Sequence, residues 1–86
     1  MAKKSTFFLL AVMALRKVLA QNVKRLRRER GLSQEALADA IGIDRTYVSA
    51  LERERYSASI DMLERLAKGL GVHPPELISS ALSSSD

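Results

Sequence analysis

The chain has 86 residues, which is the size of a single domain with one hydrophobic core, and 47% of them are hydrophobic. Fourteen lysines and arginines against ten aspartates and glutamates give a formal net charge of +4, which favours a polyanionic partner, either nucleic acid or an anionic membrane surface. The absence of cysteine excludes disulfides, thiolate metal sites and a cysteine nucleophile, and with a single histidine, His73, we expect no metal, no cofactor and no enzymatic activity.

The first segment to interpret is the apolar run at 7–15, which follows Lys3 and Lys4 as the apolar part of a signal peptide would. The run is too short to span a bilayer, Arg16 and Lys17 follow it directly, and no small-x-small cleavage site lies cleanly after it. We therefore interpret it as an extra stretch of helix and expect no membrane partner.

Apolar residues then recur at steps of three and four, which predicts one face of a long helix. These residues are Phe8, Val12, Leu15, Leu19, Val23 and Leu26. Gly31 predicts the end of this helix after Arg30. The pattern fits one unbroken helix from about Thr6 and equally a helix that bends near Arg16. The basic residues around Leu26 are expected to form a solvated face rather than a phosphate-binding patch.

Capping residues divide the rest of the chain into helices. Ser33 and Asp44 are favourable N-caps for helices 33–41 and 44–53, and Gly42 separates the two. The inward side chains of the first would be Ala36, Leu37, Ala40 and Ile41. Ser59 would cap a fourth helix that Gly71 ends, with Ile60, Leu63, Leu66, Ala67 and Leu70 inward.

Pro74 and Pro75 fit only the first turn of a fifth helix. Its apolar side would consist of Leu77, Ile78, Ala81 and Leu82. No alternating apolar pattern bounded by turn residues is present, so no strand is expected and the predicted fold class is all-α.

Two short helices joined at Gly42 and Ile43 have the layout of a helix-turn-helix, whose second helix enters the major groove of DNA. At about 100° per residue, Tyr47, Val48 and Leu51 fall on the inward side of helix 44–53. The outward side carries small, hydrogen-bonding or charged residues, namely Arg45, Thr46, Ser49, Ala50 and Arg53. Such a face fits a groove about 12 Å wide.

The segment Leu32–Glu52, LSQEALADAIGIDRTYVSALE, resembles the Xre or lambda-repressor-like helix-turn-helix family, and the order of five helices from about Leu19 to Ile78 extends the resemblance. Within the family, residues 44–49 are most similar to the controller proteins of restriction–modification systems. The resemblance implies a five-helix lambda-repressor-like DNA-binding domain at 18–80. The apolar run indicates a helical extension at 1–17 before it, and a flexible tail is expected at 81–86.

The resemblance also implies roles for individual residues. The expected base contacts are Arg45, Thr46, Ser49 and Ala50, and the expected DNA-backbone contacts are Gln34, Tyr47, Arg53, Arg55 and Ser57. Arg27 and Glu52 occupy positions that pair as a partly buried ion bridge. Two places depart from the family: residues 53–57 replace a turn that usually contains glycine or asparagine, and His73 stands where a serine or threonine cap is common, with Glu76 as its expected capping partner.

On a helix, the run at 7–15 is apolar in nearly every direction, and such a helix has to be covered on all sides. We expect a second copy to cover it, which predicts a homodimer. The expected dimerisation residues are Phe7, Phe8, Leu10, Leu77, Ile78 and Leu82.

The function implied by these features is that of a cytoplasmic, homodimeric transcriptional regulator that binds double-stranded DNA at a roughly palindromic operator. RNA polymerase is a further expected partner. One alternative with the same fold is an antitoxin, whose apolar amino terminus would cover a partner toxin. Another alternative is a helical module that binds proteins or a membrane surface without binding DNA.

Overall fold

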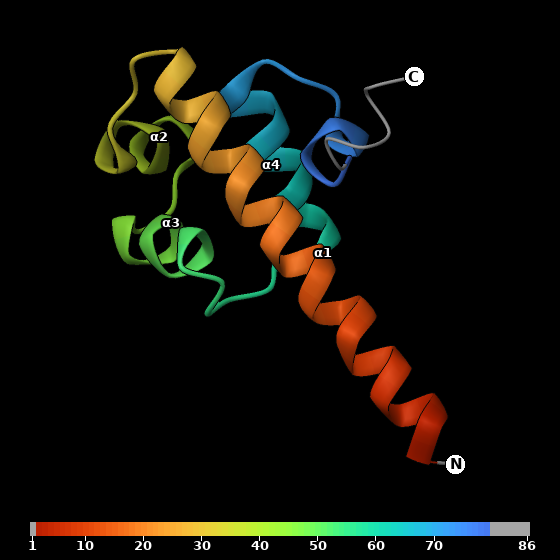
Figure 1. Ribbon diagram of the computed structural model, residues 1–86. Coiled ribbons are helices and arrows are strands. Elements are labelled where there is room, and N and C mark those ends of the chain that lie inside the picture. Colours follow the sequence, from red (N-terminus) through yellow and green to blue (C-terminus); the bar gives the residue numbers. More distant parts are fainter. Residues whose placement is uncertain (1, 80–86) are drawn as a thin grey trace.

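The computed structural model describes residues 2–79, and their side chains from Thr6 onward (Figure 1). The elements are α1 (Ala2–Glu29), α2 (Gln34–Ile41), α3 (Arg45–Glu52), α4 (Ile60–Leu70) and a short 3₁₀ helix, η1 (Pro74–Leu77). Every element in this described range is helical, so the all-α prediction is confirmed.

The three predicted N-caps are confirmed. The side-chain oxygens of Ser33, Asp44 and Ser59 each accept a hydrogen bond of 2.8–3.1 Å from a backbone N–H in the first turn of α2, α3 and α4. These bonds satisfy donors that the helices themselves leave unpaired. The chain thus marks the beginning of each short helix with a local side chain.

The helix ends share one backbone geometry. After α2, Gly42 has a φ of 72°, and the N–H of Ile43 donates to the carbonyl oxygen of Ala38 at 2.9 Å, which is a Schellman motif. After α3 the same motif occurs, but the left-handed position is occupied by Glu54, with a φ of 63°. Glu54 is the one non-glycine residue with positive φ in the described part of the chain, and its side chain makes that conformation costly.

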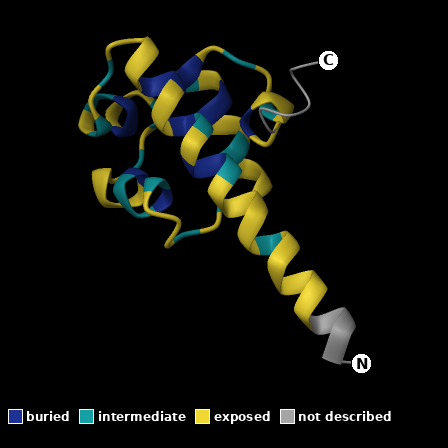
Figure 2. Cartoon of the chain, viewed as in Figure 1, coloured by how far each residue is buried: buried dark blue, intermediate teal, exposed yellow. Residues whose placement is uncertain are grey.

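The core lies where the helices converge, as the buried residues in Figure 2 show. It consists of Leu19, Ala20, Val23, Leu26, Leu37, Ala38, Val48, Leu51, Leu66, Ala67, Leu70 and Leu77. Both α1 and α4 pack on η1, and the side chain of Asn22 donates hydrogen bonds to the backbone oxygens of Leu77 (2.8 Å) and Ser79 (2.9 Å). The segment after α4 is thereby fixed against α1.

Several predicted inward positions are wrong. Ala40 is exposed and Ala38 is buried in its place, because α2 turns its Leu37–Ala38 side toward α3 and α4. Ile60, the first residue of α4, is 77% exposed, since α4 meets the core only further along. The fifth helix is the single turn of η1, and Ala81 and Leu82 lie outside the described residues.

The long first helix continues unbroken through Arg16, so the alternative with a bend there is wrong. Its amino-terminal part projects from the body of the molecule with no other element beside it (Figure 1). By length and composition alone, Thr6–Glu29 could cross a membrane, since its most apolar 18-residue window has a mean hydropathy of 1.4 and only 17% of that window is buried.

Part of this helix also belongs to the core. Leu19 and Val23 are buried in the domain, so only the part of α1 that precedes them projects from it.

Candidate nucleic-acid interface

Helices α2 and α3 form the predicted helix-turn-helix. Val48 and Leu51 are buried and hold α3 against the core, so its opposite side faces solvent. On that side Arg45 and Thr46 are exposed, and Ser49 and Ala50, one turn further on, are half-buried. The four residues predicted to contact bases are therefore brought together on one side of a helix that is fixed from behind.

The first turn of α3 is organised by Asp44. Its Oδ1 accepts hydrogen bonds from the backbone N–H of Thr46 (2.8 Å) and from the Thr46 hydroxyl (2.7 Å). These two bonds lower the pKa of the Asp44 carboxyl. Because the hydroxyl proton is directed to Asp44, Thr46 can offer a DNA base an acceptor oxygen and a methyl group while this bond lasts.

The structure also brings Arg27 and Glu52 together. Arg27 donates to the two carboxylate oxygens of Glu52, from Nε at 2.7 Å and from Nη2 at 3.0 Å, and from Nη1 to the carbonyl oxygen of Leu32 at 2.8 Å. Burial opposes the ionised form of Glu52, but hydrogen bonds from Arg27 and Gln34 outweigh it and lower the pKa of the carboxyl. The bond to Glu52 raises the pKa of Arg27.

Gln34 belongs to this network as well. Its Nε2 donates to Oε1 of Glu52 at 3.1 Å, and the side chain is half-buried. A primary amide has two N–H donors, so one remains for the DNA phosphate that was predicted as its partner. The sequence alone did not indicate the contact between Gln34 and Glu52, because nothing in the spacing relates the first residue of α2 to the last residue of α3.

Tyr47 departs from the prediction. It was placed on the inward side of α3, but it is 42% exposed. Its ring packs edge-on against Tyr56 of the α3–α4 connection, with ring centroids 4.6 Å apart and an interplanar angle of 73°. Tyr47 raises the pKa of the Tyr56 hydroxyl. Val48 and Leu51 define a narrower buried side than the sequence suggested, and Tyr47 lies at its edge.

Tyr56 was missed by the sequence interpretation. With Thr46, Tyr47 and Ala50 it lines a shallow hollow on the solvent side of α3. An aromatic residue in an otherwise polar connection was the available signal. The three other connection residues with predicted DNA-backbone roles, Arg53, Arg55 and Ser57, are all exposed.

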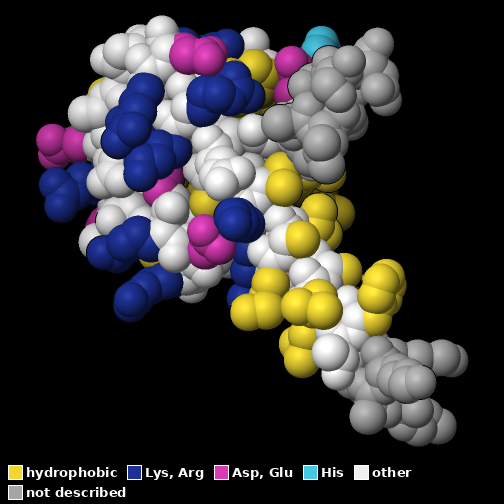
Figure 3. Space-filling view, in the orientation of Figure 1, with side chains coloured by type: hydrophobic (Ala, Val, Ile, Leu, Met, Phe, Trp, Pro, Cys, Tyr) yellow, Lys and Arg dark blue, Asp and Glu magenta, His cyan; other side chains and the backbone are white. Residues whose placement is uncertain are grey.

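The surface of the molecule divides by side-chain type. In Figure 3, lysines and arginines gather over the globular part, and hydrophobic side chains follow the projecting part of α1. Of the predicted dimerisation residues, Phe7, Phe8, Leu10 and Ile78 are exposed. Leu77 is wrong as a dimer contact because it is fully buried in its own domain, and Leu82 lies outside the described residues.

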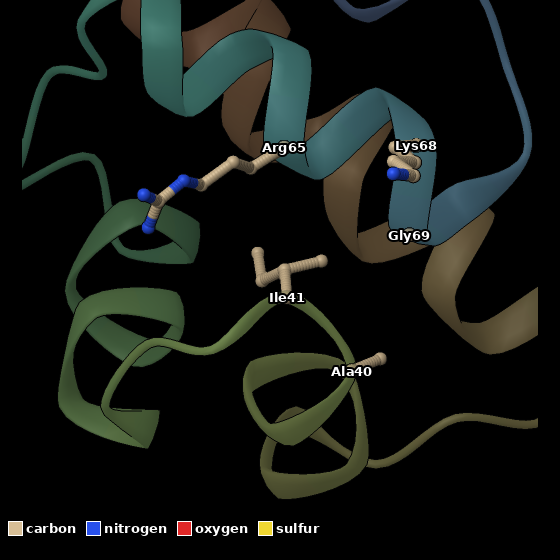
Figure 4. A pocket seen from close by; sticks show the side chains of 5 residues that line it. All are labelled: Ala40, Ile41, Arg65, Lys68 and Gly69. Atoms are coloured by element: carbon tan, nitrogen blue, oxygen red, sulfur yellow. The ribbon is translucent and has the colours of Figure 1, made fainter.

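A second hollow lies between the end of α2 and α4 (Figure 4). It is lined by Ala40, Ile41, Arg65, Lys68 and Gly69. Gly69 matters for packing, because a Cβ built at this position would collide with the Cγ2 methyl of Ile41. The absence of a side chain there lets α2 and α4 approach closely.

Comparison with known proteins identifies this architecture. The model of a helix-turn-helix family, described as "Helix-turn-helix", matches residues 23–77, which is more than half of the chain. The chain belongs to this helix-turn-helix family. The resemblance noted from Leu32–Glu52 is thereby confirmed.

A hypothetical transcription factor of Neisseria meningitidis is 47% identical over 64 residues, which cover 74% of this chain and 60% of that protein. This chain thus spans less than two thirds of that relative. A crystal structure of a hypothetical transcription factor from Neisseria superposes with a TM-score of 0.80 at 42% identity, over 83% of this chain and 82% of that one.

Restriction–modification controller proteins are similar too. The structure of C.AhdI from Aeromonas hydrophila has a TM-score of 0.70 at 39% identity, and covers 72% of this chain and 94% of its own. The controller protein C.Esp1396I, solved as a tetramer in complex with its natural 35 base-pair operator, has a TM-score of 0.66 at 33% identity over 76% of this chain and 96% of its own.

Proposed function

We propose that this protein is a sequence-specific transcriptional regulator that acts in the cytoplasm as a homodimer on a roughly palindromic operator. The observation that carries the proposal is the geometry of α3. Buried Val48 and Leu51 and the bond from Arg27 to Glu52 fix this helix from behind, and its free side presents Arg45 and Thr46 to solvent. We call α3 the recognition helix from here on.

Arg45 is the principal base contact in this proposal. It lies in the first turn of the recognition helix, the part that reaches base edges in helix-turn-helix docking. Its guanidinium can donate to both O6 and N7 of guanine, so each half-site contains a guanine. Thr46, Ser49 and Ala50 contribute shorter contacts, including apolar contact between the Ala50 methyl and a thymine methyl.

The DNA backbone is contacted on both sides of the recognition helix. Gln34 lies at the start of α2, and the exposed Arg53, Arg55 and Ser57 follow the recognition helix. Tyr47 is exposed enough to place its hydroxyl near a phosphate. These contacts set the orientation of the domain on the duplex and carry no sequence information of their own.

Two copies are needed for an operator with two half-sites. In helix-turn-helix dimers the recognition helices enter successive major grooves about 34 Å apart, and the symmetry of the protein matches the symmetry of the site. The regulator bound at its operator then either blocks access of RNA polymerase to the DNA or contacts RNA polymerase directly. In this proposal, the domain at 18–80 would contact the DNA, and the extension at 1–17 would form the contact between the two copies.

The exposed extension also supports a second candidate, an antitoxin of the same fold. Phe7, Phe8 and Leu10 are each more than half exposed, and a toxin of similar size could cover them. Co-purification of such a toxin with the protein from its native host would favour this candidate. Failure to bind any DNA sequence selectively would favour a module that binds proteins or a membrane surface.

The decisive experiment is the selection of bound sequences from a random pool of duplex DNA. We expect enrichment of a two-fold symmetric motif with one guanine in each half-site. The variant Arg45→Ala should lose enrichment at that guanine while it retains the spacing of the half-sites. An enriched motif without symmetry, or no enrichment, contradicts the proposal.

A further inference from the structure

The projecting part of α1 carries exposed apolar side chains that the domain does not cover. Phe7 is 75% exposed, Phe8 66% and Leu10 61%. Monomeric proteins rarely present a continuous apolar surface of this extent, so the segment requires a partner. The base-contacting side of the recognition helix does not include this surface.

The same chain also contains an apolar groove. The groove lies where α1 leaves the domain, and its volume is about 250 Å³. Its walls are Val12, Leu15, Arg16 and Leu19 of α1, Ser57 and Ala58 of the α3–α4 connection, Leu63 of α4, and Ile78. An apolar cavity of about 150 Å³ is large enough to hold a benzene ring. The groove therefore has room for one phenylalanine side chain.

Phe8 lies on the same side of α1 as the groove but cannot fill it within its own chain. The steps from Phe8 to Val12 and Leu15 place all three on one face of the helix. Because α1 is unbroken, Phe8 remains about 10 Å along the axis from Leu15 at ~1.5 Å per residue. The groove can receive a phenylalanine only from another molecule.

We propose that the groove is filled by Phe8 of a second copy, and that the two α1 extensions lie antiparallel along their Phe8–Val12–Leu15 faces. Each copy then inserts its Phe8 beside Leu63 and Ile78 of the other. A chain that carries both the inserted residue and its groove forms a closed pair with two-fold symmetry, which is the usual symmetry of homodimers.

Exposure and charge both favour a second copy as the occupant. The proposed contact would cover Phe8, Leu15 and Ile78, which are 66%, 53% and 44% exposed, on both copies at once. The antiparallel arrangement places Arg16 near the Thr6 end of the partner helix, so the two Arg16 side chains are kept apart. A parallel arrangement would bring these like charges together.

The inference deepens the proposed homodimer and rests on it, but it can be tested without DNA. The chain contains no tryptophan, so Phe8→Trp introduces a single fluorescent reporter. We expect its emission to shift to the blue as protein concentration rises through the dimer dissociation constant, with sedimentation showing dimer over the same range. A protein that dimerises as described but binds DNA without sequence selectivity would contradict the proposed role of the recognition helix and leave this dimer contact supported.

Two substitutions separate this contact from any other dimer contact. Phe8→Ala should raise the dimer dissociation constant at least about tenfold, as expected for the loss of a buried phenylalanine at each of two symmetric sites. Leu10→Ala removes a side chain of similar exposure on the opposite side of α1 and should have a smaller effect. Thermal unfolding of both variants checks that the domain remains folded.

A complementation experiment completes the test. Ala58→Phe should fill the groove and weaken self-association, whereas a mixture of Phe8→Ala and Ala58→Phe chains should form heterodimers more readily than either homodimer, because the intact Phe8 of one chain meets the open groove of the other. The proposal is overturned if the Phe8→Trp emission stays that of a solvent-exposed indole at all concentrations. It is overturned equally if the shift appears only with anionic lipid vesicles, or if Phe8→Ala and Leu10→Ala weaken the dimer equally.

Discussion

Arg27 and Glu52 connect the first helix to the last turn of the recognition helix through two hydrogen bonds, and their side chains are only 10% and 3% exposed. Both charged groups are thus largely removed from solvent. A buried ion pair of this kind is costly to break from one side, because the remaining charge stays buried without a partner. The position of the recognition helix therefore depends on a residue of α1.

The first prediction concerns this pair. Arg27→Met should lower the free energy of unfolding by about 3–5 kcal/mol, and the loss in the Arg27→Met/Glu52→Gln double variant should be smaller than the sum of the two single losses. Urea unfolding of the four proteins measures this. Arg25 and Glu29 provide the control, since that pair is more than half exposed and should contribute less than about 1 kcal/mol. Additive losses for Arg27 and Glu52 would contradict the prediction.

The second prediction concerns acid. The pKa of Glu52 is lowered in the folded protein, so the unfolded chain binds a proton at this carboxyl more readily than the folded chain does. The stabilisation is complete above the unfolded pKa, ~4.3, and is lost as pH falls through the lower folded pKa. Urea unfolding between pH 3 and pH 7 should show a steeper decline for the wild type than for Glu52→Gln. Because the pKa of Asp44 is also lowered, the free energy of unfolding of Glu52→Gln should still decrease as pH falls, but less steeply.

The third prediction follows from the strained end of the recognition helix. Glu54→Gly should raise the free energy of unfolding by about 1 kcal/mol, because glycine adopts the left-handed conformation without the steric cost of a side chain. The neighbouring Arg53 has a φ of −96°, and Arg53→Gly should destabilise the protein instead. Equal effects of the two glycines on the midpoint of thermal unfolding would show that the conformation of Glu54 carries no strain.

The fourth prediction concerns the close approach of α2 and α4. Gly69→Ala should destabilise the protein even though alanine favours helices by about 1 kcal/mol, because the new methyl collides with Ile41. In an Ile41→Ala background the same change should become neutral or stabilising. A double-mutant cycle by urea unfolding measures the coupling free energy between the two residues. A coupling of zero would contradict the predicted collision between the new methyl group and Ile41.

The fifth prediction separates base contact from phosphate contact. Arg45→Ala should weaken binding to the selected operator by about 1–3 kcal/mol per half-site and weaken binding to random DNA much less. Arg55→Ala should weaken both kinds of DNA similarly and flatten the dependence of affinity on salt. Titrations at several salt concentrations distinguish the two. If Arg45→Ala affects operator and random DNA by the same factor, Arg45 is a phosphate contact.

The sequence was informative wherever a local signal decides the structure. The beginnings of three helices could be predicted from Ser33, Asp44 and Ser59, because the side chain of each accepts a hydrogen bond from a backbone N–H only two or three residues away. It was less informative where burial depends on which neighbours a helix meets. Ala40 and Ile60 have the periodicity of core residues, but both are exposed.

In the candidate site, the positions of Arg45 and Thr46 followed from helix periodicity and from the family resemblance. The contact between Tyr47 and Tyr56 did not, because it depends on the path of an irregular connection that turns at Glu54. The bond from Gln34 to Glu52 was missed for a similar reason, since it joins two helices across a tertiary contact.

The unbroken course of α1 has a mechanical consequence. The exposed segment around Phe8 and the buried Arg27 lie on one helix without a flexible joint, and Arg27 in turn holds the recognition helix. A partner bound at the projecting end would therefore have a fixed orientation and distance relative to the recognition helix. Each residue inserted between Leu15 and Leu19 would rotate that partner by about 100° about the helix axis and move it about 1.5 Å along the axis. The length of α1 would thus determine which spacing of half-sites two copies joined through α1 can reach.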